Sequence, residues 1–273
     1  MQAVVKSSVA SMRDEPRADI PLSDEVLYGM MAQILEEPVN GWYKVRTDYQ
    51  YEGYLSGADL LFDPQLTGQW AQLSHKRVYQ AYADILSAPD VESLLLISLP
   101  RGAVIHEAEP EKEPGGWVRV LLCDGTSGYT KSKFIGTFHD RKSGQNEDEF
   151  RQNVLDTAKS YMGTQYRWGG KTPLGIDCSG LTSMSYLING VTIYRDAQIR
   201  EGFPVREIAF QDKKPADLLF FTGHVAMYLG EGRYIHSTGK NGSDGVVINS
   251  LDPEAPDYRD DLPDRLYATG SIF

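Results

Sequence analysis

The 273-residue chain is poor in cysteine, short of positive charge and without long hydrophobic runs. Its two cysteines, Cys123 and Cys178, cannot form a disulfide framework, so the fold must rest on hydrophobic cores. The formal net charge is −11, and residues 1–149 carry 14 Lys and Arg against 23 Asp and Glu. Because a surface of that sign repels polyanions, nucleic acid and anionic membranes are disfavoured as partners.

No stretch approaches the roughly 18 apolar residues of a membrane-spanning helix, and the N-terminal MQAVVKSSVASMRDEPR has no apolar core long enough for a secretory signal. From the chain as written we expect a cytoplasmic, monomeric protein. A secreted or wall-associated protein is the alternative if a signal sequence has been removed. Apolar residues make up 41% and charged residues 24%, which is ordinary for a globular protein, and the length favours two or three domains.

An internal repeat organises the first half of the chain. GWYKVRTDYQYEGYLSGADLLF and GWVRVLLCDGTSGYTKSKFIGTF both run Gly-Trp, an alternating strand and then Gly-Tyr. The distance from Trp42 to Gly53 equals that from Trp117 to Gly128, at 11 positions. Period-2 alternation with closely spaced turn residues predicts short antiparallel strands in two similar small barrels.

Further strands are predicted in AVVKSSVASMR, VLYGMMAQILEE and ESLLLISLPRGAVIHEA, and a helical piece is predicted around Trp70 to Leu86. We therefore assign residues 1–68 to a first barrel and residues 69–144 to a helical connector with a second barrel. The polar segment HDRKSGQNEDEF reads as a linker to a last domain at 145–273. The barrels resemble the bacterial SH3-like domains that accompany cell-wall enzymes.

The last domain begins with a helical pattern and ends in strands, which predicts an α+β fold. Its first helix is predicted to bury one face and to stop at Gly163; that face consists of Phe150, Val154, Leu155, Ala158 and Met162. The strands are predicted in DLLFFTGHVAMYLG and RYIHST.

Cys178 stands at the start of a second helical pattern, in which Leu181, Met184 and Leu187 recur at helical spacing. Asp177 occupies the N-cap position, which places the sulfur in the first helical turn. There the helix dipole and free N–H groups favour the thiolate, so we expect a lowered pKa and a nucleophilic cysteine. The alternative is a buried cysteine that acts only as a small hydrophobic residue.

A base is predicted from GHVAMYLGEGRYIHST, which reads as a hairpin with its turn at Gly230. That turn pairs residue 228 with 232 and places His224 opposite His236 on one face. The arrangement predicts a Cys–His–His relay, in which His224 takes the proton of Cys178 and His236 orients His224. A zinc site made of the same three residues is the rival chemistry, although it lacks a fourth ligand.

The motifs YRWGG, DCSGL, PADLLFF, GHVAMYLG and YIHST make the chain similar, over most of 150–273, to the NlpC cysteine peptidases that cut bacterial cell-wall peptides. The resemblance implies a papain-like α+β domain with Cys178 as nucleophile, His224 as general base and His236 as third member of the triad. It also implies that Tyr166 and the backbone N–H of Cys178 form the oxyanion hole. Such chemistry requires no metal and no organic cofactor.

The same resemblance implies substrate-binding roles for four further residues, namely Asp177, Ser179, Arg195 and Asp196. The chain departs from the family at 215–217, where the usual Pro-Gly-Asp is Pro-Ala-Asp. This changes a turn and leaves the predicted catalytic set intact.

Two SH3-like barrels before the peptidase domain resemble the YkfC-like γ-D-glutamyl-L-diamino acid endopeptidases. In that group an acid and a tyrosine of the first barrel receive the free amine of an N-terminal L-alanine. Tyr51 matches the tyrosine, or is an aromatic residue packed at a barrel edge, whereas Met30 stands where an acid is expected. Neighbouring acids, such as Asp24, Glu25, Glu36 or Glu37, are the candidates to replace it, and the alternative is a looser preference for a free amine.

We therefore predict that the protein is a cysteine endopeptidase. Its expected reaction is hydrolysis of the γ-D-glutamyl-L-diamino acid bond of murein peptides, with meso-diaminopimelate or L-Lys as the diamino acid. A murein peptide with a free N-terminal L-Ala is the expected partner. Two alternatives stay open: an N-acetylmuramoyl-L-alanine amidase on the same fold, and a non-catalytic wall-binding protein.

Overall fold

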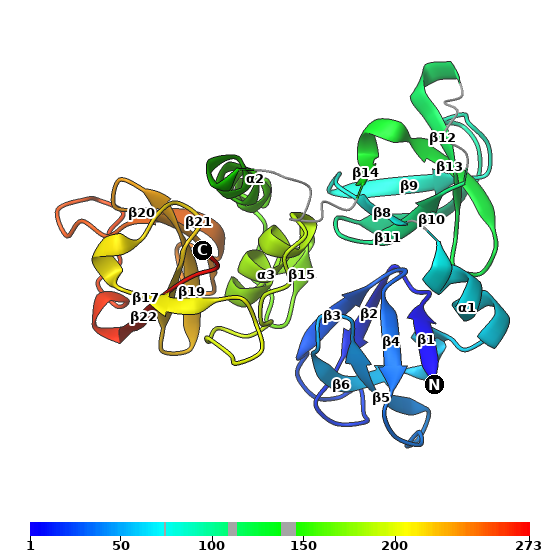
Figure 1. Cartoon of the computed structure of the whole chain (residues 1–273), viewed down its shortest axis with the longest axis horizontal. Helices are drawn as coiled ribbons and strands as arrows, with labels where there is room; N and C mark the ends of the chain where they lie inside the picture. The colour runs from blue at the N-terminus through cyan, green and yellow to red at the C-terminus, as the bar shows by residue number, and fades with distance from the viewer. Residues whose placement is uncertain (74, 109–113, 138–145) are drawn as a thin grey trace. The chain divides into compact units, whose positions relative to one another are not determined.

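The computed structural model describes residues 1–73, 75–108, 114–137 and 146–273 (Figure 1). The chain divides into two compact units, Met1–Phe138 and His139–Phe273, which are taken one at a time. The predicted boundary at 144/145 and most of the predicted linker lie outside the described residues. Within the described part of the chain, no helix is long and apolar enough to cross a membrane.

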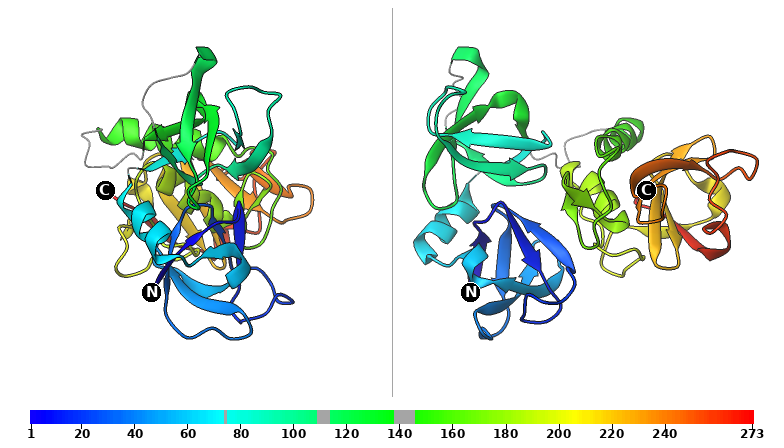
Figure 2. Two further views of the ribbon diagram at one scale, coloured as in Figure 1. Left: turned by 90° about the vertical axis from the view of Figure 1, so that its right-hand side faces the viewer. Right: turned by 180° about the vertical axis from the view of Figure 1, so that it is seen from behind.

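The first unit consists of two small barrels, each built, in its described residues, of seven strands with a 3-10 helix before the last one. The first barrel contains β1 (Gln2–Val5), β2 (Val9–Met12), β3 (Asp24–Leu27), β4 (Met31–Ile34), β5 (Trp42–Thr47), β6 (Glu52–Ser56), η1 (Gly57–Asp59) and β7 (Leu60–Leu61). The second contains β8 (His75–Val78), β9 (Tyr82–Leu86), β10 (Leu95–Pro100), β11 (Val104–Glu107), η2 (Pro114–Gly116), β12 (Trp117–Leu121), β13 (Ser127–Lys131), η3 (Ser132–Phe134) and β14 (Ile135–Thr137). Both are visible in the two further views of Figure 2.

Strand pairing confirms that the barrels are repeats of one another. β1 pairs with β4 and β7, and β8 pairs in the same way with β11 and β14. The two Gly-Trp segments form the equivalent hairpins β5–β6 and β12–β13. Gly53 and Gly128 are needed there because an added Cβ would lie 2.5 Å from the side chain of Met12 or of Ile85, respectively.

The helix predicted around Trp70 to Leu86 is wrong. The helix is α1 (Pro64–Gln72), which begins earlier because Asp63 caps it and Pro64 occupies its first turn. The following residues form β8 and β9, where buried Ala83 and exposed Asp84 show the alternation of a strand. The predicted boundary at 68/69 therefore falls inside α1.

The second unit combines two helices with an antiparallel sheet. Its elements are α2 (Glu147–Lys159), β15 (Lys171–Thr172), β16 (Gly175–Ile176), α3 (Cys178–Ile188), β17 (Arg206–Ile208), η5 (Phe210–Asp212), β18 (Leu218–Phe221), β19 (His224–Gly230), β20 (Arg233–Thr238), β21 (Gly245–Ser250), η6 (Pro263–Arg265) and β22 (Leu266–Ser271). The sheet runs β17-β22-β18-β19-β20-β21, and α3 packs against β19 and β20 (Figure 1). This is the predicted α+β architecture.

The first helix of this unit buries its predicted apolar face, except for one residue. Phe150, Val154 and Ala158 are buried, whereas Met162 lies beyond the end of α2 and is 47% exposed. Its predicted place in the core is therefore wrong. Gly163 has a φ of +79°, as expected of a residue that reverses the chain after a helix.

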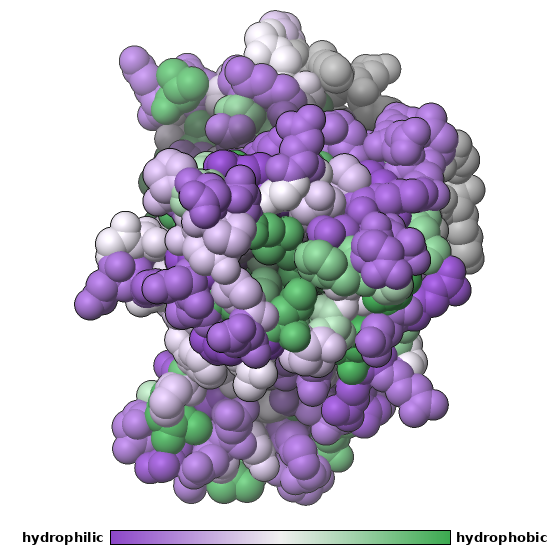
Figure 3. Space-filling model, turned by 90° about the vertical axis from the view of Figure 1, so that its left-hand side faces the viewer, coloured by the Kyte–Doolittle hydropathy of each residue, from purple (hydrophilic) through white to green (hydrophobic). Residues whose placement is uncertain are grey.

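Outside the cores, most side chains on the face in Figure 3 are hydrophilic, with hydrophobic residues grouped near its middle.

Candidate active site

Cys178 is the first residue of α3, as its sequence pattern predicts. The side chain of Asp177 caps the helix by accepting a hydrogen bond from the N–H of Gly180 at 2.5 Å. Cys178 is 7% exposed, and the backbone of Val225 and of Ser179 lies near enough to its sulfur to favour the thiolate. Since Val225 directly follows His224 in β19, the folding of α3 onto β19 brings the predicted nucleophile to the start of the histidine strand.

A buried arginine holds the loop around the nucleophile. Arg195 is 2% exposed, and its Nη1 and Nη2 each lie 3.1 Å from a carboxylate oxygen of Asp177. Nη1 also donates to Ser179 Oγ at 2.8 Å, and Gly169 N donates to Asp177 at 2.8 Å. The carboxylate of Asp177 and the hydroxyl of Ser179 are thus engaged inside the protein, together with the guanidinium of Arg195.

The two histidines lie on one face of the sheet, but in a different register from the predicted one. Tyr228 pairs with Tyr234, and not with residue 232, because a bulge precedes Gly230 and the turn is formed by residues 231 and 232. The slip is two positions, so no side chain changes face. His224 and His236 therefore become diagonal neighbours, which still brings them into contact.

A chain of hydrogen bonds runs from His224 into the interior. His224 Nε2 lies 2.7 Å from His236 Nδ1, and His236 Nε2 lies 2.8 Å from Asn249 Oδ1. Asn249 Nδ2 donates to the carbonyl oxygen of Asp257 at 2.6 Å. His236 is fully buried, whereas His224 is partly buried at the start of its strand. Sequence patterns do not reveal Asn249, because its role depends on the pairing of β21 with β20.

Burial sets the resting protonation of this site. It raises the pKa of the Cys178 thiol to about 11, with a further contribution from the negative charge of Asp177, so the predicted lowering of this pKa is wrong. Burial also lowers the pKa of His224 to about 3, assisted by His236, and lowers the pKa of His236 to about 4. At neutral pH these pKa values leave Cys178 as a thiol and both imidazoles neutral, and a neutral imidazole is the form that can accept a proton.

Tyr166 lies next to the nucleophile in a segment that bridges to Ile176. Burial, followed by the charges of Cys178 and Asp177, raises the pKa of its hydroxyl, which therefore stays protonated. Within the described residues the hydroxyl makes no hydrogen bond, so it remains available to donate one to a ligand. The ring packs against Gly239, where an added Cβ would lie 3.1 Å from it.

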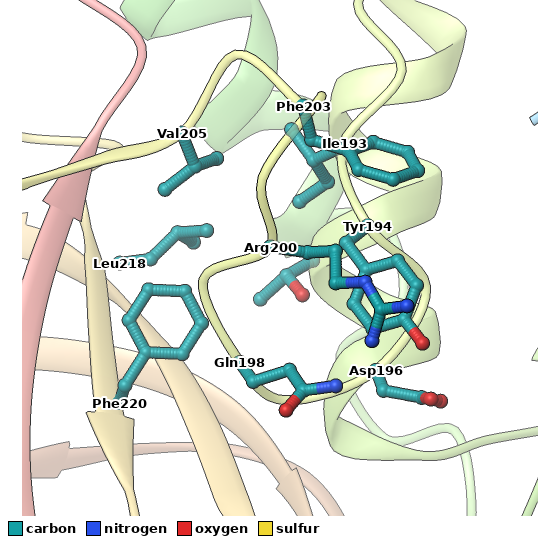
Figure 4. Close-up of a pocket in the computed structure, with 10 residues that line it drawn as sticks. Ile193, Tyr194, Asp196, Gln198, Arg200, Phe203, Val205, Leu218 and Phe220 are labelled. Carbon is teal, nitrogen blue, oxygen red and sulfur yellow. The ribbon is translucent and has the colours of Figure 1, made fainter.

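A small pocket that is partly open to solvent lies beside α3 (Figure 4). Its wall is apolar on the sheet side, with Leu218 and Phe220, whereas Asp196 and Arg200 bring opposite charges to it. The remaining lining residues are Thr182, Ile193, Tyr194, Gln198, Phe203 and Val205. Arg195 and Asp196, which are adjacent in the sequence, therefore lie in different places: the side chain of Arg195 is buried in the interior, and Asp196 lines this pocket.

The residues expected to bind an amine lie in the first unit. Tyr51 directly precedes β6 and exchanges hydrogen bonds with Thr47, and Met30 is 4% exposed. Asp24 is fully buried and accepts a hydrogen bond from Tyr49 Oη at 2.5 Å. Asp48, which the sequence reasoning missed, is exposed and its Oδ2 lies 3.4 Å from the backbone N of Met31. The carboxylate of Asp48 therefore lies beside the residue that follows Met30, the position where the family resemblance implies an acid.

The geometry does not favour the zinc alternative. The facing nitrogens of His224 and His236 share a hydrogen bond, so their lone pairs do not converge on a common point. Across the described ranges, no group of three or more His, Cys, Asp or Glu side chains is placed to hold a metal ion.

Comparison with known proteins places these residues in a family context. The model of the NlpC/P60 family matches residues 163–259, and that of the bacterial dipeptidyl-peptidase SH3 domain matches residues 12–60. Dipeptidyl-peptidase 6 of Lysinibacillus sphaericus is 45% identical over 276 residues, which cover 100% of both chains. A γ-D-glutamyl-L-lysine dipeptidyl-peptidase of Bacillus cereus is 36% identical over 129 residues, or 44% of this chain and 37% of the relative.

A solved structure supports the fold over the whole chain. The crystal structure of an NlpC/P60 family protein from Bacillus cereus matches with a TM-score of 0.79 and covers 98% of each chain. Its sequence identity is 20%, so the likeness concerns the fold alone.

Proposed function

The chain belongs to the NlpC/P60 family, and we propose that this cysteine peptidase hydrolyses the γ-D-glutamyl-L-diamino acid bond of murein peptides. The observation that carries the proposal is the site itself: a thiol at a capped helix start, in contact with the strand that begins at His224, with a His–His pair behind it. Relatives named as γ-D-glutamyl-L-lysine dipeptidyl-peptidases support the choice of bond.

Acylation starts from the neutral pair. As the Cys178 sulfur attacks the γ-carbonyl carbon, His224 accepts the thiol proton and the carbonyl oxygen becomes an oxyanion. The Tyr166 hydroxyl and the Cys178 N–H, which has no partner within its own helix, donate hydrogen bonds to that oxygen. Collapse of the intermediate breaks the amide bond, and the imidazolium of His224 protonates the leaving amine of the diamino acid.

Deacylation repeats the same steps with water. His224 is neutral again after the amine leaves, so it accepts a proton from water as the water attacks the thioester carbon. The second tetrahedral intermediate expels the Cys178 sulfur, which regains its proton from His224. The products are a peptide that ends in D-glutamate and a free diamino acid or its C-terminal peptide.

We place the side chain of the diamino acid in the pocket beside α3. Two residues that line the pocket are close in the fold to the nucleophile. Thr182 follows Cys178 by one helical turn, and Phe220 pairs with Val225, whose backbone lies near the Cys178 sulfur. The apolar sheet side suits methylene groups, Asp196 suits an ammonium group and Arg200 suits a carboxylate. That combination favours meso-diaminopimelate, which ends in both groups, over L-Lys, which ends in an ammonium group alone.

We further propose that the first barrel selects a free N-terminal amine, with Asp48 in place of the acid missing at Met30. Asp48 is three residues before Tyr51, and its carboxylate lies at the backbone of Met31. Among the other candidate acids, Asp24 and Glu25 are buried, and Glu36 forms an ion pair with Lys44. A free-amine requirement restricts the enzyme to soluble wall fragments that have lost their N-acetylmuramoyl group, which suits recycling of wall peptides.

The test is mass-spectrometric product analysis with L-Ala-γ-D-Glu-meso-diaminopimelate, its N-acetylated form and its L-Lys analogue. We expect cleavage at the γ-D-glutamyl bond, loss of turnover in Cys178→Ala, and preference for the free amine. Asp48→Asn should abolish that preference, whereas Glu36→Gln, which alters an exposed acid paired with Lys44, should keep it. Cleavage only after N-acetylmuramoyl would identify an amidase, and wall binding without any turnover would identify a binding protein.

A further inference from the structure

Three polar side chains line up on one face of three neighbouring strands. His224 begins β19, His236 lies in β20 and Asn249 lies in β21. Tyr234 pairs with Asn249 and Val247 pairs with His236, so His236 and Asn249 are diagonal neighbours on that face. Asn249 is 7% exposed, and both ends of its amide have partners.

The orientation of the Asn249 amide follows from its backbone partner. A carbonyl oxygen can only accept, so the group that faces the carbonyl of Asp257 at 2.6 Å must be the Nδ2 amino group. The amide oxygen Oδ1 then faces His236 at 2.8 Å, and this oxygen can also only accept. His236 must therefore carry a proton on Nε2.

The same logic extends to the catalytic base. A neutral His236 with its proton on Nε2 has a lone pair on Nδ1, and this nitrogen faces His224 Nε2 at 2.7 Å. His224 must then donate from Nε2, which leaves its Nδ1 unprotonated. We propose that Asn249 is a positioning residue that sets the tautomer of both histidines and so leaves His224 Nδ1 as the base for the Cys178 proton.

The chain of hydrogen bonds therefore runs in one direction, from His224 through His236 and Asn249 to the backbone carbonyl of Asp257. During acylation His224 becomes an imidazolium that still donates from Nε2 to His236, so no second proton transfer is needed. Nearby charges act on the relay from other segments: Arg259 and Asp261 influence both rings, and Arg265 influences His224. Asn249 differs from these groups because it is neutral and touches His236 directly.

The first test uses the tautomers themselves and does not depend on the substrate. Two-dimensional ¹H–¹⁵N spectra of ¹⁵N-labelled protein at pH 7 distinguish a protonated Nε2 from a protonated Nδ1 in each imidazole. We expect Nε2–H in both His224 and His236 of the parent protein, and mixed tautomers in Asn249→Leu. Nδ1–H in His236 of the parent would overturn the proposal, whatever the enzyme cleaves.

The second test is kinetic and rests on the proposed function. In Asn249→Leu we expect kcat to fall about 10- to 100-fold with little change in KM, which is the size of effect seen when a metal-bound histidine loses the hydrogen-bond partner of its other nitrogen. Asn249→Asp keeps an acceptor toward His236, although its second oxygen faces the Asp257 carbonyl in place of the Nδ2 donor. It should therefore retain more activity than Asn249→Leu and move the acidic limb of the pH profile to higher pH, because a carboxylate stabilises the imidazolium.

Asn189→Leu is the matched control. Asn189 is 6% exposed and donates to Thr157 Oγ1 and to the carbonyl of Ser185 at the end of α3. Its loss should cost comparable stability while leaving both tautomers and kcat unchanged. Equal effects of Asn189→Leu and Asn249→Leu on kcat would show that Asn249 contributes only to stability.

Discussion

Replacing Arg195 with leucine distinguishes a structural from a substrate-binding role for this residue. The sequence motif suggests contact with substrate, whereas the structure occupies the guanidinium with Asp177 and Ser179. The substitution removes one partner of a buried ion pair and leaves the carboxylate of Asp177, whose side chain is 10% exposed, without its cation. Such a loss typically costs about 3–5 kcal/mol.

The lower end of that range applies here. Asp177 keeps its hydrogen bonds from Gly180 N at 2.5 Å and from Gly169 N at 2.8 Å, so its charge is not left unsolvated. A loss of about 3 kcal/mol in a unit of this size corresponds to a fall of roughly 10–15 °C in the midpoint of thermal unfolding. Calorimetry of Arg195→Leu beside the parent protein measures that fall.

Arg200→Leu is the control for this prediction. Arg200 is exposed, lies above the ring of Tyr194 and lines the proposed diamino-acid pocket. Its replacement should change the unfolding free energy by no more than about 0.5 kcal/mol and should raise KM for the meso-diaminopimelate peptide. An unchanged midpoint together with a raised KM in Arg195→Leu would refute the structural role.

Three further predictions concern the site and its surroundings. The pKa values of about 3 for His224 and about 4 for His236 lie below the ordinary 6.5, so the unfolded chain binds more protons and stability should fall as pH drops below about 6.5. Urea midpoints at pH 7 and pH 5 measure this fall, and the pH dependence should be weaker in His236→Gln. In a variant without the other cysteine, alkylation of Cys178 by iodoacetamide should rise about tenfold per pH unit from pH 7 to 9, as its pKa of about 11 requires, and a plateau below pH 7.5 would contradict that value. Gly180→Ala should prevent stable folding because its Cβ would lie 2.2 Å from a backbone oxygen, whereas Gly68→Ala, with open space inside α1, should gain about 0.5–1 kcal/mol; equal effects on the urea midpoint would refute this reading.

Local patterns were sufficient for the elements that carry the chemistry. Asp177 before Cys178 and the apolar spacing after it predicted the capped helix α3, because capping and amphipathic spacing act within a few residues. The repeated Gly-Trp hairpins predicted two like barrels for the same reason. The helix placed at 70–86 failed because the strands β8 and β9 are stabilised by partners distant in sequence, which local spacing does not reveal.

The sequence by itself therefore determined the chemical identity of the site: a cysteine at a helix start, two histidines on one hairpin and a tyrosine ahead of them. The tertiary structure decided how these groups behave. The pKa of Cys178 depends on how completely α3 is buried, the register of His224 and His236 on a bulge, and the part played by Asn249 on the pairing of a third strand. Burial and strand pairing bring together residues far apart in the chain, and this long-range packing sets proton affinities and hydrogen-bond directions.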